Sequence, residues 1–134
     1  MISKLSFTQV LKGIIELVES KTELKCYDDV PKNSPMPCYQ AEFVGQEPTP
    51  AKTMWIEEYY VNIHAYAKGG SSVHIFNAIQ KLEEAMTVGI NLPQGYELSK
   101  QEPHGLQAIL TEEDGSKHAV LGYKLEIVYG YKFK

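Results

Sequence analysis

The chain has 134 residues, of which 43% are hydrophobic and 22% are charged, and its 13 lysines against 17 acidic residues give a net charge of -4. This size and composition predict a single folded domain over residues 1–134 and exclude a disordered or fibrous chain. All 13 of these cationic residues are lysines, and the chain contains no arginine. Because arginine is the usual residue for gripping phosphates and reading bases, and because the chain is acidic, tight or base-specific binding of nucleic acid is not expected.

No apolar run approaches the roughly 18 residues of a membrane span. The N-terminus opens directly on an amphipathic pattern, unlike a secretory signal segment, so we expect a cytosolic product. Cys26 and Cys38 are then expected to be free thiols, and a disulfide between them is the less favoured alternative.

The first predicted element is an amphipathic helix over residues 7–20. Ser6 and Gln9 have the spacing of a capping box, and apolar residues follow at steps of three and four. This apolar stripe consists of Phe7, Val10, Leu11, Ile14, Ile15 and Val18. The opposite face is charged, so the helix is expected to lie on a core.

Two short strands are predicted next, over residues 24–27 and 38–45. The segment between them, residues 31–37, holds three prolines and cannot pair in a sheet. A polar loop with two further prolines is predicted over residues 46–53.

Residues 54–67 alternate between an apolar and a polar face and predict the first long strand. Residues 68–72 interrupt it, and a second helix is expected to follow, capped by Ser71 or Ser72 and ending near Gly89. Its apolar positions are Ile75, Phe76, Ile79, Leu82 and Met86.

The C-terminal third predicts strands over residues 96–101, 106–111 and 118–133, with an Asp-Gly turn before the last. Sixteen extended residues span roughly 50 Å, more than the diameter of about 36 Å of a compact domain of this size. A bend at Gly122 or Gly130 is favoured, and projection of the hairpin is the alternative.

These elements predict an α+β fold in the order α-β-β-β-α-β-β-β, with a mainly antiparallel sheet and both helices packed on it. Where the helical and strand periodicities meet, we expect one shared core. Its predicted members are Leu11, Ile15, Val61, Ile63, Ile79, Leu82, Leu125 and Ile127.

Residues with catalytic or metal-binding spacing were sought and not found. The four histidines, His64, His74, His104 and His118, and the two cysteines do not match a zinc motif. Glu57 and Glu58 are neighbours on a strand, so they point to opposite faces and cannot share a site. The Gly-Ser turn at residues 69–72 lacks the lysine of a P-loop. We expect no catalytic residue, metal or cofactor, and no enzyme activity.

The element order resembles the tail terminator and tail-completion proteins of long-tailed bacteriophages. The similarity extends over nearly the whole chain. It is carried by the opening stripe of the first helix, residues 27–31 (YDDVP) leading to residues 37–39 (PCY), the strand at residues 61–66, and Gly122-Tyr123 in the last strand.

The resemblance implies a structural subunit that caps the tail tube as a homo-oligomeric ring, with a hexamer as the expected size. It implies contacts with the tail-tube protein and a head-completion or connector protein, no cofactor, and loops that face a channel. DNA would pass through this channel without specific binding, which suits an acidic chain without arginine. The expected location is the tail or neck of the virion, after assembly in the host cytoplasm.

The loop at residues 46–53 is predicted to be mobile in the free protein and to be used in assembly, because irregular polar loops often carry function. The candidate interface residues are Glu47, Thr49, Lys52, Trp55 and Tyr66. The main alternative is a small ligand- or protein-binding module without catalysis, in which Trp55 and the tyrosines line an apolar pocket. An enzyme is the third class.

Overall fold

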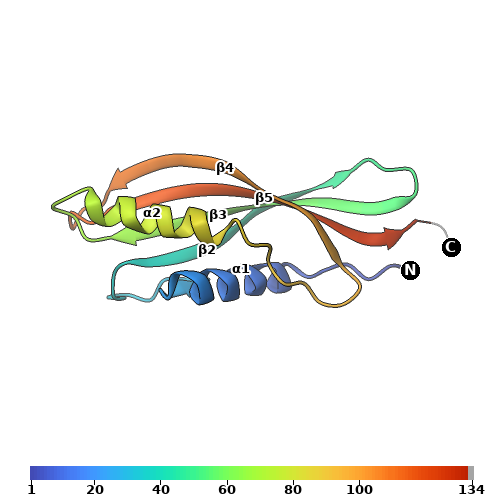
Figure 1. Cartoon of the computed structure of the whole chain (residues 1–134), viewed down its shortest axis with the longest axis horizontal. Coiled ribbons are helices and arrows are strands. Elements are labelled where there is room, and N and C mark those ends of the chain that lie inside the picture. Colours follow the sequence, from blue (N-terminus) through green and yellow to red (C-terminus); the bar gives the residue numbers. More distant parts are fainter. Residues whose placement is uncertain (133–134) are drawn as a thin grey trace.

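The computed structural model describes residues 1–132, and within them the chain forms two helices and five strands (Figure 1). The elements are, in chain order, α1 (Phe7–Thr22), β1 (Cys26–Tyr27), β2 (Cys38–Thr49), β3 (Met54–Ala67), α2 (Val73–Ala85), β4 (Glu97–Thr111) and β5 (Lys117–Tyr131). The strands form one sheet in the order β1-β2-β3-β5-β4, with β1 parallel to β2 and the other pairs antiparallel. The predicted α+β class is confirmed.

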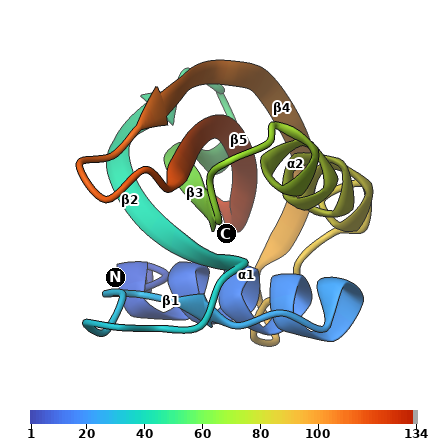
Figure 2. The same ribbon diagram turned by 90° about the vertical axis from the view of Figure 1, so that its left-hand side faces the viewer.

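Both helices lie against the curved sheet, α1 next to β1 and β2 and α2 next to β3 and β5 (Figure 2). A continuous apolar core fills the space between them, and six of the eight predicted core residues are buried in it. The phenol of Tyr39 crosses this core and donates a hydrogen bond of 2.7 Å to the carbonyl oxygen of Ala78 on α2. The buried hydroxyl is therefore satisfied, and it ties β2 to α2.

The other two predicted core residues, Leu11 and Ile15, are only half-buried. Helix α1 begins as predicted, because the hydroxyl of Ser6 accepts a hydrogen bond of 3.2 Å from the Gln9 amide. Its buried face, however, is centred on Val10, Ile14, Leu17 and Val18. The stripe read from the sequence was wider than the face that the sheet covers, so its margin remains partly open to solvent.

The predicted loop at residues 46–53 is wrong in its bounds, because β2 continues to Thr49 and pairs with β3. Pro48 lies within this strand, opposite Glu57. A proline is tolerated there because β1 pairs with β2 only at Tyr39 and Gln40, which leaves this part of β2 at the edge of the sheet. Only residues 50–53 lie outside the two strands.

The two strands predicted at residues 96–101 and 106–111 are one, β4, so the order after α2 is β-β and not β-β-β. Its ladder to β5 continues through three register shifts, one of them between Pro103 and Gly105. Pro103 lies in the gap that was predicted between the two strands. Because β4 is an edge strand, no strand lies on its open side that could need the N–H group that Pro103 lacks.

The long last strand both bends and projects. Trp55 pairs with Gly130 and Ile56 with Val128, so Tyr129 is an extra residue, and Gly130 has the positive φ of 136° that favours glycine. The tip of the β2–β3 hairpin and the end of β5 extend past the helices beside the N-terminal residues (Figure 1). Phe133, the predicted end of the strand, lies outside the described residues.

Both cysteines are free, as predicted, and both are buried. Cys26 is 4% exposed, and burial raises the pKa of its thiol to about 12. Burial also raises the pKa of the Cys38 thiol, so both thiols are shifted toward the protonated form.

Candidate assembly surface

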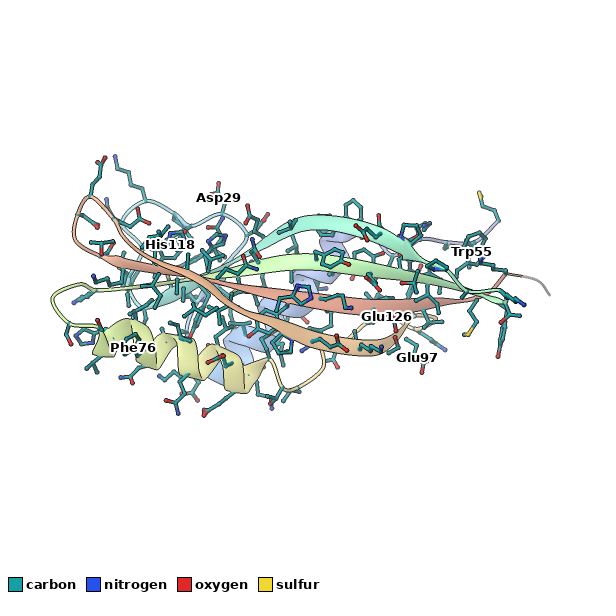
Figure 3. All side chains as sticks on the ribbon, turned by 90° about the horizontal axis from the view of Figure 1, so that it is seen from above. Asp29, Trp55, Phe76, Glu97, His118 and Glu126 are labelled. Carbon is teal, nitrogen blue, oxygen red and sulfur yellow. The ribbon has the colours of Figure 1, made fainter. Side chains whose placement is uncertain are left out.

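Four of the five predicted interface residues lie together at the projecting end of the sheet. Glu47 and Thr49 are at the end of β2, Lys52 is in the loop between β2 and β3, and Trp55 is at the start of β3. Figure 3 shows Trp55 at one end of the molecule and His118 toward the other. We call residues 46–58 together with Lys4 and Lys132 the hairpin end.

Tyr66 does not belong to this group. It lies at the opposite end of β3, where it pairs with Cys38 of β2 and His118 of β5. Its half-buried ring stacks on His118 with 4.4 Å between centroids. Strand alternation placed Tyr66 correctly on the polar face, but position along a strand of 14 residues separates it from Trp55.

Trp55 is the large aromatic side chain of the hairpin end, and 41% of its surface is exposed. The ammonium of Lys132 lies 5.0 Å from the centroid of its ring, within the range of a cation–π contact. Beside the indole is a cleft of about 280 Å³. It is lined by Lys4, Pro48, Thr49, Pro50, Trp55, Ile56, Glu57 and Lys132.

Glu57 is a buried carboxylate within the hairpin end, with 5% of its surface exposed. It forms an ion pair with Lys4 and accepts a hydrogen bond from the side-chain amide of Gln46. The Lys4 ammonium also lies 5.3 Å from the ring centroid of Tyr129. These contacts fasten the N-terminal segment to the hairpin and to β5.

The role of Glu57 was missed, although the sequence held a signal for it. On β3 it occupies the same face as Tyr59 and Val61, both of which are buried. A carboxylate on the apolar face of a strand requires a partner. The partner, Lys4, is 53 positions away along the chain, so sequence spacing could not identify it.

Glu58 points to the other face, as expected for the next residue of a strand. It accepts hydrogen bonds of 2.6 Å from the Tyr60 hydroxyl and 3.2 Å from the Thr49 hydroxyl. The Tyr60 bond is the main reason why the pKa of Glu58 is lowered, and the same bond raises the pKa of Tyr60 to about 12. Both faces of the hairpin end thus carry polar networks.

A larger cleft, of about 540 Å³, lies elsewhere, between α2 and the proline segment. It is lined by Leu24, Met36, Pro37, Lys68, His74, Asn77, Ala78, Gln80, Lys81 and Glu84. Trp55 does not line this cleft; it lines the smaller cleft of the hairpin end. Within residues 1–132, no group of three or more His, Cys, Asp or Glu side chains could hold a metal ion. No helix in this range is long and apolar enough to cross a membrane.

Comparison with known protein families gives a match along the whole chain. The family model, described as "Putative tail termination protein" (Phage_tail_terminator_4), matches residues 1–134. The chain belongs to the phage tail terminator family. It is accordingly a structural protein of a bacteriophage tail, and the resemblance stated from the sequence is confirmed.

The fold of this terminator family member also occurs in a solved particle. A chain of the virion of a native gene transfer agent (GTA) particle superposes with a TM-score of 0.68 at 12% sequence identity. The match covers 92% of this chain and 99% of the other, so the two share the fold over nearly their whole lengths. A search of curated protein sequences found no match.

Proposed function

We propose that the protein caps the tail tube as a homo-oligomeric ring, with a hexamer as the expected size, and joins the tube to a head-completion or connector protein. Membership of the tail terminator family supports the capping role, and the shared fold with a chain of a GTA virion is consistent with a place in a particle. The expected location is the tail or neck, after assembly in the host cytoplasm.

The projecting hairpin end, with its exposed Trp55, is the main support for placing the assembly contact on this surface. Tryptophan is enriched among the residues that contribute most to protein interfaces, and Trp55 sits between Pro48, Pro50 and Lys132 rather than on a free loop. Its conformational entropy is partly lost before binding, which favours association. We assign the contact with the neighbouring tail or head protein to this end.

The free subunits are expected to remain monomeric until a tail or head surface templates the ring. Within residues 1–132, the edge of β2 beyond Gln40 and the outer edge of β4 pair with no further strand, so both are open to a neighbouring copy. A net charge of -4 without arginine suits a ring through which DNA passes without binding specifically.

The test combines purified protein with tails and heads that lack it, and measures joined particles and a ring at the tail end by electron microscopy. Trp55→Ala is expected to reduce joining at least about tenfold. This corresponds to the loss of about 1.4 kcal/mol of binding free energy or more, as for an important interface residue. Its melting temperature should stay close to the parent value, because Trp55 is outside the core.

The matched control is Phe76→Ala, which removes an aromatic ring of similar exposure, 55%, from α2. This variant should join particles as well as the parent. Equal joining by Trp55→Ala and the parent would remove the hairpin end from the proposal. Failure of the parent protein to bind tails or heads would overturn the capping role itself.

A further inference from the structure

A chain of three hydrogen bonds crosses the sheet on the face away from the helices, far from the hairpin end. It links one side chain of each of β2, β3 and β5 to the residue that follows β4. Glu42 Oε1 lies 2.8 Å from His64 Nε2, and His64 Nδ1 lies 2.6 Å from His118 Nε2. His118 Nδ1 then lies 2.8 Å from Glu112 Oε1.

The two imidazoles are shielded from solvent, with 15% and 14% of their side-chain surfaces exposed, whereas the Glu42 and Glu112 side chains are 51% and 43% exposed. Tyr66 covers the pair: its ring stacks on His118 and its hydroxyl donates to Gln40. The titratable groups around the imidazoles are the two carboxylates, Tyr66, and the buried thiol of Cys38 that pairs with Tyr66 on β2. Among the residues that the structure describes, no lysine forms an ion pair with Glu42 or Glu112.

The number of protons in this chain follows from its geometry. Each of the three hydrogen bonds needs one proton, whether a ring nitrogen or a carboxyl oxygen supplies it. Two neutral imidazoles carry only two N–H protons between them. Two neutral histidines between two carboxylates therefore lack one proton. All three hydrogen bonds of the Glu42–His64–His118–Glu112 arrangement form only when it holds three protons.

We propose that this Glu-His-His-Glu chain is a proton-linked clamp, which fastens β2 and the β4–β5 turn to the centre of the sheet when it holds three protons. When the third proton is lost, two lone pairs face each other at one of the three contacts, and that contact breaks. When a fourth proton is added, two N–H groups or two cationic rings oppose each other. The clamp is thus closed at intermediate pH and weakened on both sides.

The element that the clamp controls is the acidic turn at residues 112–116. Within the turn, the Glu112 amide donates to the Ser116 carbonyl oxygen at 2.9 Å. The turn also passes so close to Gly69 that a Cβ at this position would collide with the Gly115 carbonyl oxygen. The bond from His118 to Glu112 holds the start of this turn against β5. Opening the clamp removes the side-chain contact that holds the start of the turn to β5, while the backbone bonds of the turn and the core stay unchanged.

The direct test is nuclear magnetic resonance of the whole protein labelled with ¹⁵N at histidine, followed from about pH 5 to about pH 8.5, the range in which histidines ordinarily titrate. His64 and His118 are expected to show a scalar coupling across the N–N hydrogen bond and to change protonation as a coupled pair. His74, exposed on α2, is the internal reference for an independent ring. Independent titration of His64 and His118 like that of His74, without the coupling, would overturn the proposal.

The second test compares melting temperatures of the parent and His64→Gln across the same pH range. The difference should reach a maximum of about 3 °C at intermediate pH, where the parent forms one buried hydrogen-bond contact that the variant lacks. It should shrink at lower and higher pH, where the parent loses this contact as well. The control, His74→Gln, should melt like the parent at every pH. A parent-to-variant difference that is constant with pH would contradict the clamp, and the measurement on the unmodified protein decides the matter if His64→Gln does not fold.

Discussion

The covered half of the sheet and the hairpin end are built from the same strands but held by different forces. Between the helices and the sheet, Val61, Ile63 and Leu125 are at most 1% exposed and pack in one apolar cluster. At the hairpin end the inward position of β3 is taken by Glu57, which depends on Lys4 and Gln46. The alternation of β3 between buried and half-buried positions already begins at Glu57, within the hairpin end, so this pattern does not separate the two halves. Cover by the helices does.

This difference separates stability from recognition. Apolar burial of about 25 cal/mol per Å² supplies most of the folding free energy, and it is concentrated where α1 and α2 cover the sheet. Polar contacts contribute less net stability, about 1 kcal/mol each, but they fix geometry and leave a surface that can bind another protein. The hairpin end can therefore open locally while the core stays folded.

The largest effect is expected from a charge in the covered half. Ile14→Asp buries an unpaired carboxylate at a position of 0% exposure and should cost about 4 kcal/mol or more, enough to unfold much of the protein. Its neighbour supplies the matched control. Ile15 is half-buried at the margin of α1, so Ile15→Asp should cost about 1–2 kcal/mol. Urea titration measures both, and equal losses would contradict the assignment of the buried face.

A smaller effect is expected when the ion pair of the hairpin end is removed. Glu57→Gln keeps the shape but not the charge, and should lower the free energy of unfolding by about 1 kcal/mol, because Lys4 is 58% exposed and regains water. Hydrogen exchange should accelerate at the amides of the hairpin end and not in the core. The exposed Glu47→Gln is the control and should change neither quantity. Acceleration spread evenly over both halves would show that they are one cooperative unit.

The smallest effect is a pH dependence confined to the hairpin end. The hydrogen bond from Tyr60 lowers the pKa of Glu58 in the folded protein. A carboxyl whose folded pKa is lowered stabilises the fold above its ordinary pKa, and this contribution is lost as the pH falls through the folded value. Tyr60→Phe should therefore raise the pKa of Glu58 toward the ordinary range, which carboxyl ¹³C titration measures. Loss of the Thr49 bond in Thr49→Val should have the same sign and a smaller size, and an unchanged titration in Tyr60→Phe would contradict the assigned cause.

Much of the fold could be predicted because local patterns agree with the final structure. The Ser6 cap, the alternation of β3 and the Asp-Gly turn each depend on residues within a few positions of one another. The errors occurred at prolines. Pro48 was placed in a loop and Pro103 fell between two predicted strands, but each lies within a strand at an open edge of the sheet, and the position of an edge is not a local property.

The candidate surface shows the same division. Sequence alone grouped Glu47, Thr49, Lys52 and Trp55, since they are close along the chain. It could not separate Tyr66 from them or add Lys4 and Lys132, which reach Glu57 and Trp55 from the two ends of the chain.

What the sequence by itself determined is therefore the class of the fold, the identity of most core positions and the family to which the chain belongs. Hydrophobic periodicity and capping depend on residues that are close in sequence, so they are the same in any tertiary arrangement that buries the apolar faces. Only the tertiary structure decided which strands form the edges, which margin of α1 stays open, and that Glu42, His64, His118 and Glu112 meet in one chain. These features depend on the register and pairing of strands that are distant in sequence, and side chains from β2, β3, β5 and the β4–β5 turn become neighbours only when the strands pair.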